Sequence, residues 1–152
     1  MRFEEGNFGD PRVIALLEAH VGRARAETGR GSAHALDLRG LQTPDIRFWT
    51  AWRDDMLVGM GALKVLSPDH GEIKSMHTAE RARHQGVGAS VLTHIMSEAA
   101  KMGMARLSLE TGAWDYFIPA RAFYRRHGFV DCAPFADYKP DPNSVFMTRS
   151  LA

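Results

Sequence analysis

The chain has 152 residues, 45% of them hydrophobic, which is enough for one compact domain with a hydrophobic core. Its formal net charge is only +1, and acidic and basic residues are interspersed along it. This balance provides no strongly basic face for nucleic acid or an anionic membrane, and it favours a small-molecule partner. We therefore expect a single domain that spans residues 1–152.

The cysteine and histidine residues limit which disulfides and metal sites the chain can form. Cys132 is the one cysteine, so the sequence excludes an intramolecular disulfide and a cysteine-based zinc site. None of the seven histidines has metal-ligand spacing on a helix, so we expect no metal. The segment Met1–Asp10 is charged, and no run of about 18 apolar residues follows that would span a membrane. We expect a cytoplasmic protein.

The first predicted elements are a strand over Met1–Glu5 and a helix that starts at Asp10-Pro11. Asp caps free N–H groups at a helix start, and Pro is tolerated at the first helical position. Apolar residues recur at helical spacing in this helix and predict one buried stripe, made of Val13, Ile14, Leu17, Val21 and Ala24. After a glycine-containing segment, Ala33–Leu38 is expected to form a short second helix.

Three apolar runs separated by turn residues predict a meander of strands, over Ile46–Trp52, Leu57–Leu66 and Glu72–Thr78. The pattern then changes to a helical one. Gly86–Lys101 places apolar residues on one side and polar residues on the other, and Gly103 follows as a terminator.

The last predicted elements are a strand over Arg106–Glu110, a helix over Pro119–His127 and a strand over Val145–Leu151. A strand, a helix and a strand in succession imply a parallel pair inside a mixed sheet. The expected fold class is therefore α+β, with a central mixed sheet flanked by helices.

The segment Arg83-x-x-Gly86-x-Gly88 lies between the third strand of the meander and the following helix. A helix N-terminus offers unpaired N–H groups and the positive end of the helix dipole, which together bind a pyrophosphate without a metal. Two glycines also occur in ordinary loops. A dinucleotide fingerprint needs a third glycine where Val91 stands, and the Gly-Lys-Ser/Thr of a P-loop is absent.

This motif and the element order from Met1 to Leu151 resemble the GNAT family of N-acetyltransferases, whose donor signature is Arg or Gln, two residues, Gly, one residue, and Gly or Ala. The resemblance implies an acyl-CoA N-acyltransferase fold and acetyl-CoA as the donor. It assigns the pyrophosphate to the turn Arg83, His84, Gln85, Gly86, Val87, Gly88 and Ala89. The main chain of Met76, His77 and Thr78 would pair with the pantetheine arm. Thr111 stands near the position where many relatives hold that arm with Asn.

A second family signature, an aromatic helix ending in Tyr and then Gly-Phe, is present as Ala122–Phe129. The resemblance assigns Tyr124 as the general acid that protonates the leaving thiolate. A phenol with a pKa near 10 is protonated at neutral pH and can donate that proton. The alternative is a core aromatic residue without a catalytic role.

Glu72 precedes Arg83 by 11 residues, the offset at which some relatives carry a glutamate base. The alternative is a solvated strand end, with a water chain accepting the proton. Lys74 would share the face of Glu72 in a regular strand and could form an ion pair with it, whereas a bulge would separate them.

Two connections have open roles. Ala113–Ile118 covers the adenine end of the donor or forms part of the acceptor wall. Residues 134–143 border the acceptor through Asp137 or Tyr138, or they form an edge loop or a homodimer contact.

Three functions fit the sequence. The first is transfer of an acetyl group to a primary amine of a small metabolite by direct attack in a ternary complex. The second is acetylation of protein lysines or N-termini, which predicts an open peptide groove. The third is a non-catalytic acetyl-CoA sensor.

Overall fold

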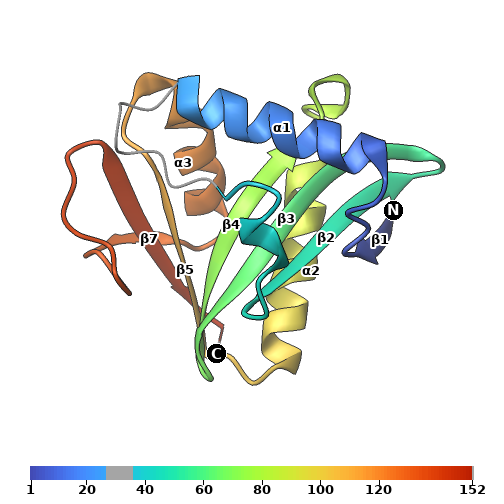
Figure 1. The fold of residues 1–152 in the computed structure, drawn as a ribbon. Helices are drawn as coiled ribbons and strands as arrows, with labels where there is room; N and C mark the ends of the chain where they lie inside the picture. The colour runs from blue at the N-terminus through green and yellow to red at the C-terminus, as the bar shows by residue number, and fades with distance from the viewer. Residues whose placement is uncertain (27–35, 152) are drawn as a thin grey trace.

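A computed structural model describes residues 1–26 and 36–151 and contains a seven-stranded sheet (Figure 1). The strands, in the spatial order β1-β2-β3-β4-β5-β7-β6, are β1 (Arg2–Glu5), β2 (Ile46–Arg53), β3 (Met56–Ser67), β4 (His70–Thr78), β5 (Arg106–Gly112), β7 (Ser144–Ser150) and β6 (Val130–Cys132). The helices are α1 (Pro11–Ala26), α2 (Val87–Lys101) and α3 (Ile118–Arg126). The short helix predicted over Ala33–Leu38 begins outside the described residues, and its described part, residues 36–38, is not helical.

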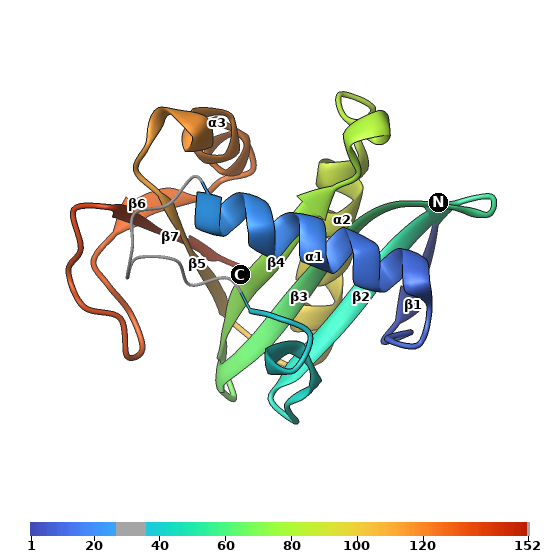
Figure 2. The same cartoon turned by 45° about the horizontal axis from the view of Figure 1, so that its top comes forward.

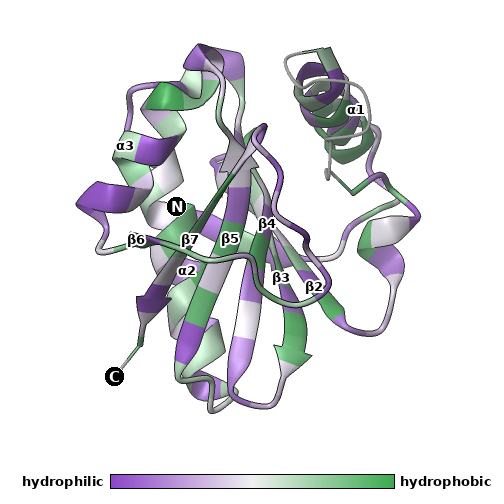
Figure 3. Cartoon of the chain, turned by 90° about the vertical axis from the view of Figure 1, so that its left-hand side faces the viewer, coloured by the Kyte–Doolittle hydropathy of each residue, from purple (hydrophilic) through white to green (hydrophobic). Residues whose placement is uncertain are grey.

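The sheet lies between helices on both faces. Helix α1 crosses one face, and α2 and α3 lie on the other (Figures 2 and 3). Strands β4 and β5 are parallel and are joined through α2, while the other neighbouring strands are antiparallel. The predicted mixed α+β sheet is therefore confirmed.

Each face of the sheet has its own hydrophobic cluster. Val13, Leu17 and Val21 of α1 are buried as the sequence pattern predicted. Val13 and Leu17 contribute to a cluster under α1 that also contains Phe48, Trp52, Leu57, Met60 and Ala62. A larger cluster joins α2 and α3 to the opposite face. Burial of apolar area at about 25 cal/mol per Å² makes these clusters the main favourable contribution to folding.

Helix α2 lies unusually close to β3 because glycine faces it there. A Cβ atom on Gly61 would stand 2.8 Å from side-chain atoms of Val91 and Ile95, closer than real Cβ contacts allow. This close approach brings the N-terminus of α2 to the end of β4, where the sequence placed the donor turn.

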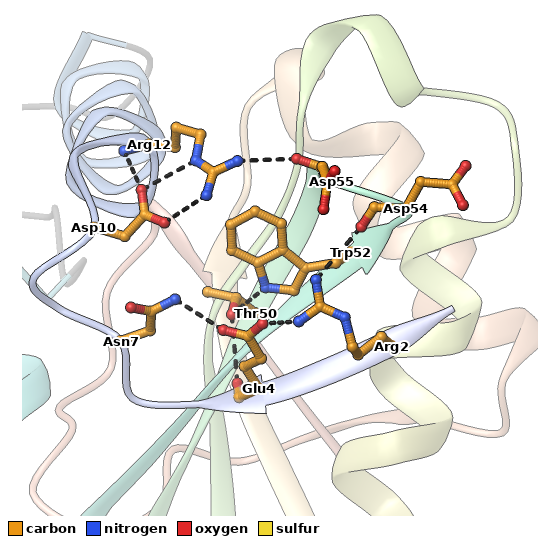
Figure 4. A network of polar contacts seen from close by, with 9 residues as sticks. All are labelled: Arg2, Glu4, Asn7, Asp10, Arg12, Thr50, Trp52, Asp54 and Asp55. Carbon is orange, nitrogen blue, oxygen red and sulfur yellow. Dashed lines mark hydrogen bonds and ion pairs between the residues drawn. The ribbon is translucent and has the colours of Figure 1, made fainter.

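A polar network fixes the start of α1 to the edge of the sheet (Figure 4). Asp10 accepts a hydrogen bond from the backbone N–H of Arg12 at 2.8 Å, which confirms the predicted cap. The Arg12 guanidinium donates to the carbonyl of Asp55 at 2.9 Å and lies over the Trp52 ring, 4.6 Å from its centroid. These contacts set the direction in which α1 crosses the sheet.

The element boundaries differ from the prediction mainly at turns. Ser67 and His70 still pair across β3 and β4, so the strands extend into what was predicted as a turn cluster. Helix α2 starts at Val87 because Gly86 has a φ of 79°, which lies outside the helical region. The short edge strand β6 was not predicted separately, since three residues carry too little alternation.

Strands β4 and β5 separate soon after they start. They pair only at His70, Gly71 and Glu72, opposite Arg106, Leu107 and Ser108. Beyond that point the register of β4 against β3 also shifts, and Ser75 has a φ of 57°. This β-bulge and the loss of pairing open the sheet between β4 and β5.

Candidate active site

A cavity of about 240 Å³ lies where β4 and β5 separate. It is bordered by α1, by both strands, by α3 and by the connections that contain Tyr116 and Tyr138. Of the residues selected from the sequence, five line it: Glu72, Met76, His77, Thr111 and Tyr124. The structure therefore brings both catalytic candidates into one cavity.

Glu72 stands at the last position of β4 that pairs with β5, and its side chain is 3% exposed. Its Oε2 accepts hydrogen bonds from Lys74 Nζ at 3.2 Å and from the Tyr138 hydroxyl at 2.5 Å. The predicted ion pair with Lys74 is thus present, because the bulge at Ser75 follows both residues instead of separating them. A solvated strand end is excluded, since the carboxylate is buried.

Tyr124 is 8% exposed, and its ring packs against Phe123 and Phe129. Among the described residues, none accepts a hydrogen bond from its hydroxyl. Burial raises the pKa of Tyr124 well above its usual value of 10, because the phenolate would lose its hydration. The phenol therefore stays protonated and can donate into the cavity.

The N-terminus of α2 has the features of an anion site. No side chain of the described residues caps its first turn, and Gly86 adopts the left-handed conformation that glycine accepts without strain. The amides of the first helical turn are therefore free to bind phosphate oxygens. The turn residues Arg83, His84, Gln85 and Gly86 are exposed, whereas the Val87 side chain is buried, so Val87 can contribute only its backbone.

Arg53 supports this turn and was missed in the sequence. Its guanidinium donates to Gln85 Oε1 at 2.7 Å and to the Gln85 carbonyl at 2.9 Å. Arg53 ends β2, far from the motif in sequence, so no local pattern could reveal it. Arg83 and His77 line a second groove between α1 and the 3-10 helix Glu80–Ala82.

The main chain of β4 from Ile73 to Thr78 has no strand partner on its β5 side. The backbone of Met76, His77 and Thr78 is therefore available for an extended ligand with amide groups, as expected for a pantetheine arm. Thr111 of β5 lines the opposite wall and pairs with Val145 of β7.

Helix α1 adds residues that the sequence reading did not select. His20 Nδ1 lies 3.2 Å from His77 Nδ1, and burial lowers the pKa of each imidazole to about 4. Arg23 lies over the Tyr116 ring, 5.4 Å from its centroid. His20 follows Leu17 by one helical turn, so the helical pattern already placed it on the inner face.

The two connections with open roles both reach the cavity. Tyr116 and Phe117, from the segment 113–118, line it, which favours the acceptor-wall interpretation of that segment. Tyr138, from the segment 134–143, lines it as well and contacts Glu72. Asp137 instead lines a separate hollow on the other side of Tyr138.

Within residues 1–26 and 36–151, no three His, Cys, Asp or Glu residues come close enough to hold a metal ion. No helix in the same part of the chain is long and apolar enough to cross a membrane. Burial raises the pKa of the Cys132 thiol, so Cys132 is not an activated nucleophile.

Several known proteins are similar to this chain in sequence and in fold. The sequence profile of the Acetyltransferase (GNAT) family matches residues 15–129. The chain is 50% identical over 140 residues to the "Uncharacterized N-acetyltransferase YsnE" of Bacillus subtilis, a match that covers 92% of this chain and 93% of that protein. It is 42% identical over 121 residues to the "IAA acetyltransferase" of Azospirillum brasilense, covering 79% and 78%. An aminoglycoside 6'-N-acetyltransferase complexed with coenzyme A has a TM-score of 0.74 at 15% identity, covering 100% and 98%, which shows the fold alone.

The fold is thus that of the acyl-CoA N-acyltransferases. The chain belongs to the Acetyltransferase (GNAT) family and is an N-acetyltransferase.

Proposed function

We propose that this enzyme transfers the acetyl group of acetyl-CoA to a primary amine of a small metabolite by direct attack in a ternary complex. The observation that carries the proposal is the cavity that joins Glu72, Tyr124 and the open edge of β4, next to the uncapped start of α2.

The described residues fit acetyl-CoA as the donor. The free amides after Gly86 suit a pyrophosphate, and the main chain of Met76–Thr78, which does not pair with β5, suits the amide groups of pantetheine. A donor that followed this path would bring its thioester to the cavity between β4 and β5, which Tyr124 also lines.

Glu72 and Tyr124 supply the two proton transfers. Glu72 takes a proton from the acceptor ammonium, and the electron pair left on nitrogen attacks the thioester carbon. The new C–N bond forms, the C–S bond breaks, and Tyr124 donates to the departing thiolate. Nitrogen loses its second proton as the amide forms, and this proton returns to the Tyr124 oxygen. Glu72 then releases the first proton to solvent, so one proton leaves the site in each turnover.

The small volume of the cavity favours a small acceptor. At about 240 Å³ it is below the range typical of drug-sized ligands, and α1, α3 and two connections border it. A protein acetyltransferase would need an open groove for a peptide. The cavity therefore supports the metabolite hypothesis over the protein hypothesis.

A panel of amines, amino acids, and peptides with free N-termini, incubated with acetyl-CoA, tests the proposal. Release of free coenzyme A thiol and mass detection of acetylated product are the two measurements. We expect turnover with one or more small amines and little with peptides. Turnover restricted to peptides contradicts the acceptor class.

Tight binding of acetyl-CoA without turnover on any acceptor contradicts the enzyme mechanism and favours a sensor. In that case Tyr124→Phe should leave the biological effect intact, whereas an enzyme should lose it.

A further inference from the structure

Tyr138 brings a distant part of the chain into contact with Glu72. It lies in the connection between β6 and β7, and its hydroxyl donates to Glu72 Oε2 at 2.5 Å. Lys74 Nζ donates to the same oxygen at 3.2 Å and to the Tyr138 hydroxyl oxygen at 3.0 Å. Lys74, Tyr138 and the carboxylate oxygen Oε2 of Glu72 therefore form a closed triangle of hydrogen bonds.

The other carboxylate oxygen is not used in this triangle. Glu72 Oε1 has no hydrogen bond with any described residue, and Glu72 lines the cavity that also contains Tyr124. The contacts divide the carboxylate into one anchored oxygen and one oxygen that is free to accept a proton.

The position of Tyr138 is itself fixed by aromatic neighbours. Its ring centroid lies 5.2 Å from that of Phe135 and 5.3 Å from that of Phe146. Lys74 Nζ lies 5.7 Å from the ring centroid. A phenol held on three sides can fix the carboxylate more firmly than a long lysine side chain alone, because it has fewer rotatable bonds.

Burial, followed by the charge of Glu72, raises the pKa of Tyr138 well above its usual value. The phenol therefore keeps its proton and acts as a donor throughout the neutral range. The charged and titratable groups around the carboxylate are Lys74 and His70 of β4, Lys64 of β3, Glu110 of β5 and Tyr138.

We propose that Tyr138 is a positioning residue that holds Glu72 Oε2, so that Oε1 faces the amine of the acceptor. The inference rests on the proposed function, in which Glu72 is the base. The acceptor N–H bond breaks, its proton goes to Oε1, and the electron pair stays on nitrogen. Tyr138 keeps its own proton and forms no bond with a substrate.

The variant Tyr138→Phe keeps the ring and removes only the hydroxyl. We expect kcat to fall about tenfold with little change in the KM for acetyl-CoA, since the donor path lies elsewhere. Steady-state kinetics from pH 5 to 9 measure kcat and KM across the profile.

A double-mutant cycle with Glu72→Gln isolates the role of the phenol. Glu72→Gln alone should lower kcat/KM by about 10²–10⁴-fold, and adding Tyr138→Phe should then cost little more. Ser108→Ala is a matched control, because it also removes a buried hydroxyl. Ser108 pairs with Glu72 across the strands, but its hydroxyl bonds His70 at 2.7 Å, so its variant should keep the wild-type pH profile.

The outcomes separate the two proposals. Wild-type kcat and pH profile in Tyr138→Phe, together with an impaired Glu72→Gln, contradict the positioning role alone. Equal losses from Tyr138→Phe in both backgrounds contradict it too, because they indicate a general structural defect. Full activity of Glu72→Gln, or a wild type without turnover on any amine, contradicts the proposed function and this inference with it.

Discussion

Tyr124 combines a buried ring with a hydroxyl that has no partner among the described residues. The Tyr124 hydroxyl is not among the fully buried polar atoms that lack a partner, so it is accessible, and Tyr124 lines the cavity. A hydroxyl that is accessible beside a cavity and makes no internal hydrogen bond is available to a ligand. This single observation favours a catalytic role over the core-aromatic alternative.

Tyr124→Phe should therefore leave the fold intact and impair turnover. We expect the free energy of unfolding to stay within about 0.5 kcal/mol of wild type, since no internal hydrogen bond is lost. The kcat should fall about 100-fold while acetyl-CoA binding is retained. Urea unfolding and steady-state kinetics measure the two effects. A large loss of stability with unchanged kcat would assign Tyr124 to the core.

Glu72 and Tyr124 could be selected from the sequence because each stands at a fixed distance from a local motif. Tyr138 could be named only as a neighbour of the acceptor, because its contact with Glu72 spans 66 residues. No sequence motif pointed to Arg53, because its contact with Gln85 spans 32 residues. A sequence pattern describes neighbouring residues of one segment. Contacts between residues far apart in the chain form only on folding, so the pattern does not contain them.

The turn between β4 and α2 depends on the conformation of Gly86. Its φ of 79° is strained for any other residue, although no atom stands within 4 Å of a Cβ placed there. Gly88 is different, because it is helical and a Cβ there would make only an ordinary contact with Phe123 at 3.5 Å. The two glycines of one motif therefore have different physical requirements.

Gly86→Ala should weaken donor binding more than Gly88→Ala does. A left-handed alanine costs roughly 1–2 kcal/mol, and relief of that strain would reorient the amides at the start of α2. We expect the Kd for coenzyme A, measured by calorimetry, to rise about tenfold or more in Gly86→Ala. Gly88→Ala should bind more tightly than Gly86→Ala and should unfold at an equal or higher urea concentration than wild type. The reverse order of affinities would contradict this account of the turn.

The elements themselves followed closely from periodicity, with shifts of one or two residues at most ends. The helical stripe of α1 is clear because it faces one apolar cluster, and the meander strands appear as apolar runs because they contribute residues to the clusters on both faces of the sheet. The separation of β4 from β5 was not predictable in the same way. It depends on a bulge at Ser75, a residue that ordinary strand patterns do not mark.

At the scale of the whole molecule, α1 is joined to the sheet at two ends. The network around Asp10 and Arg12 fixes its start, and the pair of His20 and His77 lies near its end, beside the cavity. At neutral pH both imidazoles are uncharged, because burial lowers the pKa of each from 6.5 to about 4. A proton on His77 would further disfavour protonation of His20. The charges of Arg83 and Arg23 disfavour protonation of His77.

This pair should make the stability of the protein depend on pH in a defined window. Between pH 6.5 and 4 the unfolded chain binds more protons at these positions than the folded one, so stability is present above pH 6.5 and falls as the pH decreases. At pH 5 the loss is at most about 2 kcal/mol for each histidine, and less because both remain partly exposed. Urea unfolding at pH 7, 6 and 5 measures the slope. The measured range, pH 7 to 5, lies above the ordinary pKa values of 4.5 for Glu5 and 3.8 for Asp10, and Arg47 and Arg12 lower these two pKa values further. A double variant, His20→Gln with His77→Gln, should flatten the slope, and an unchanged slope in that variant would show that the pH dependence arises elsewhere.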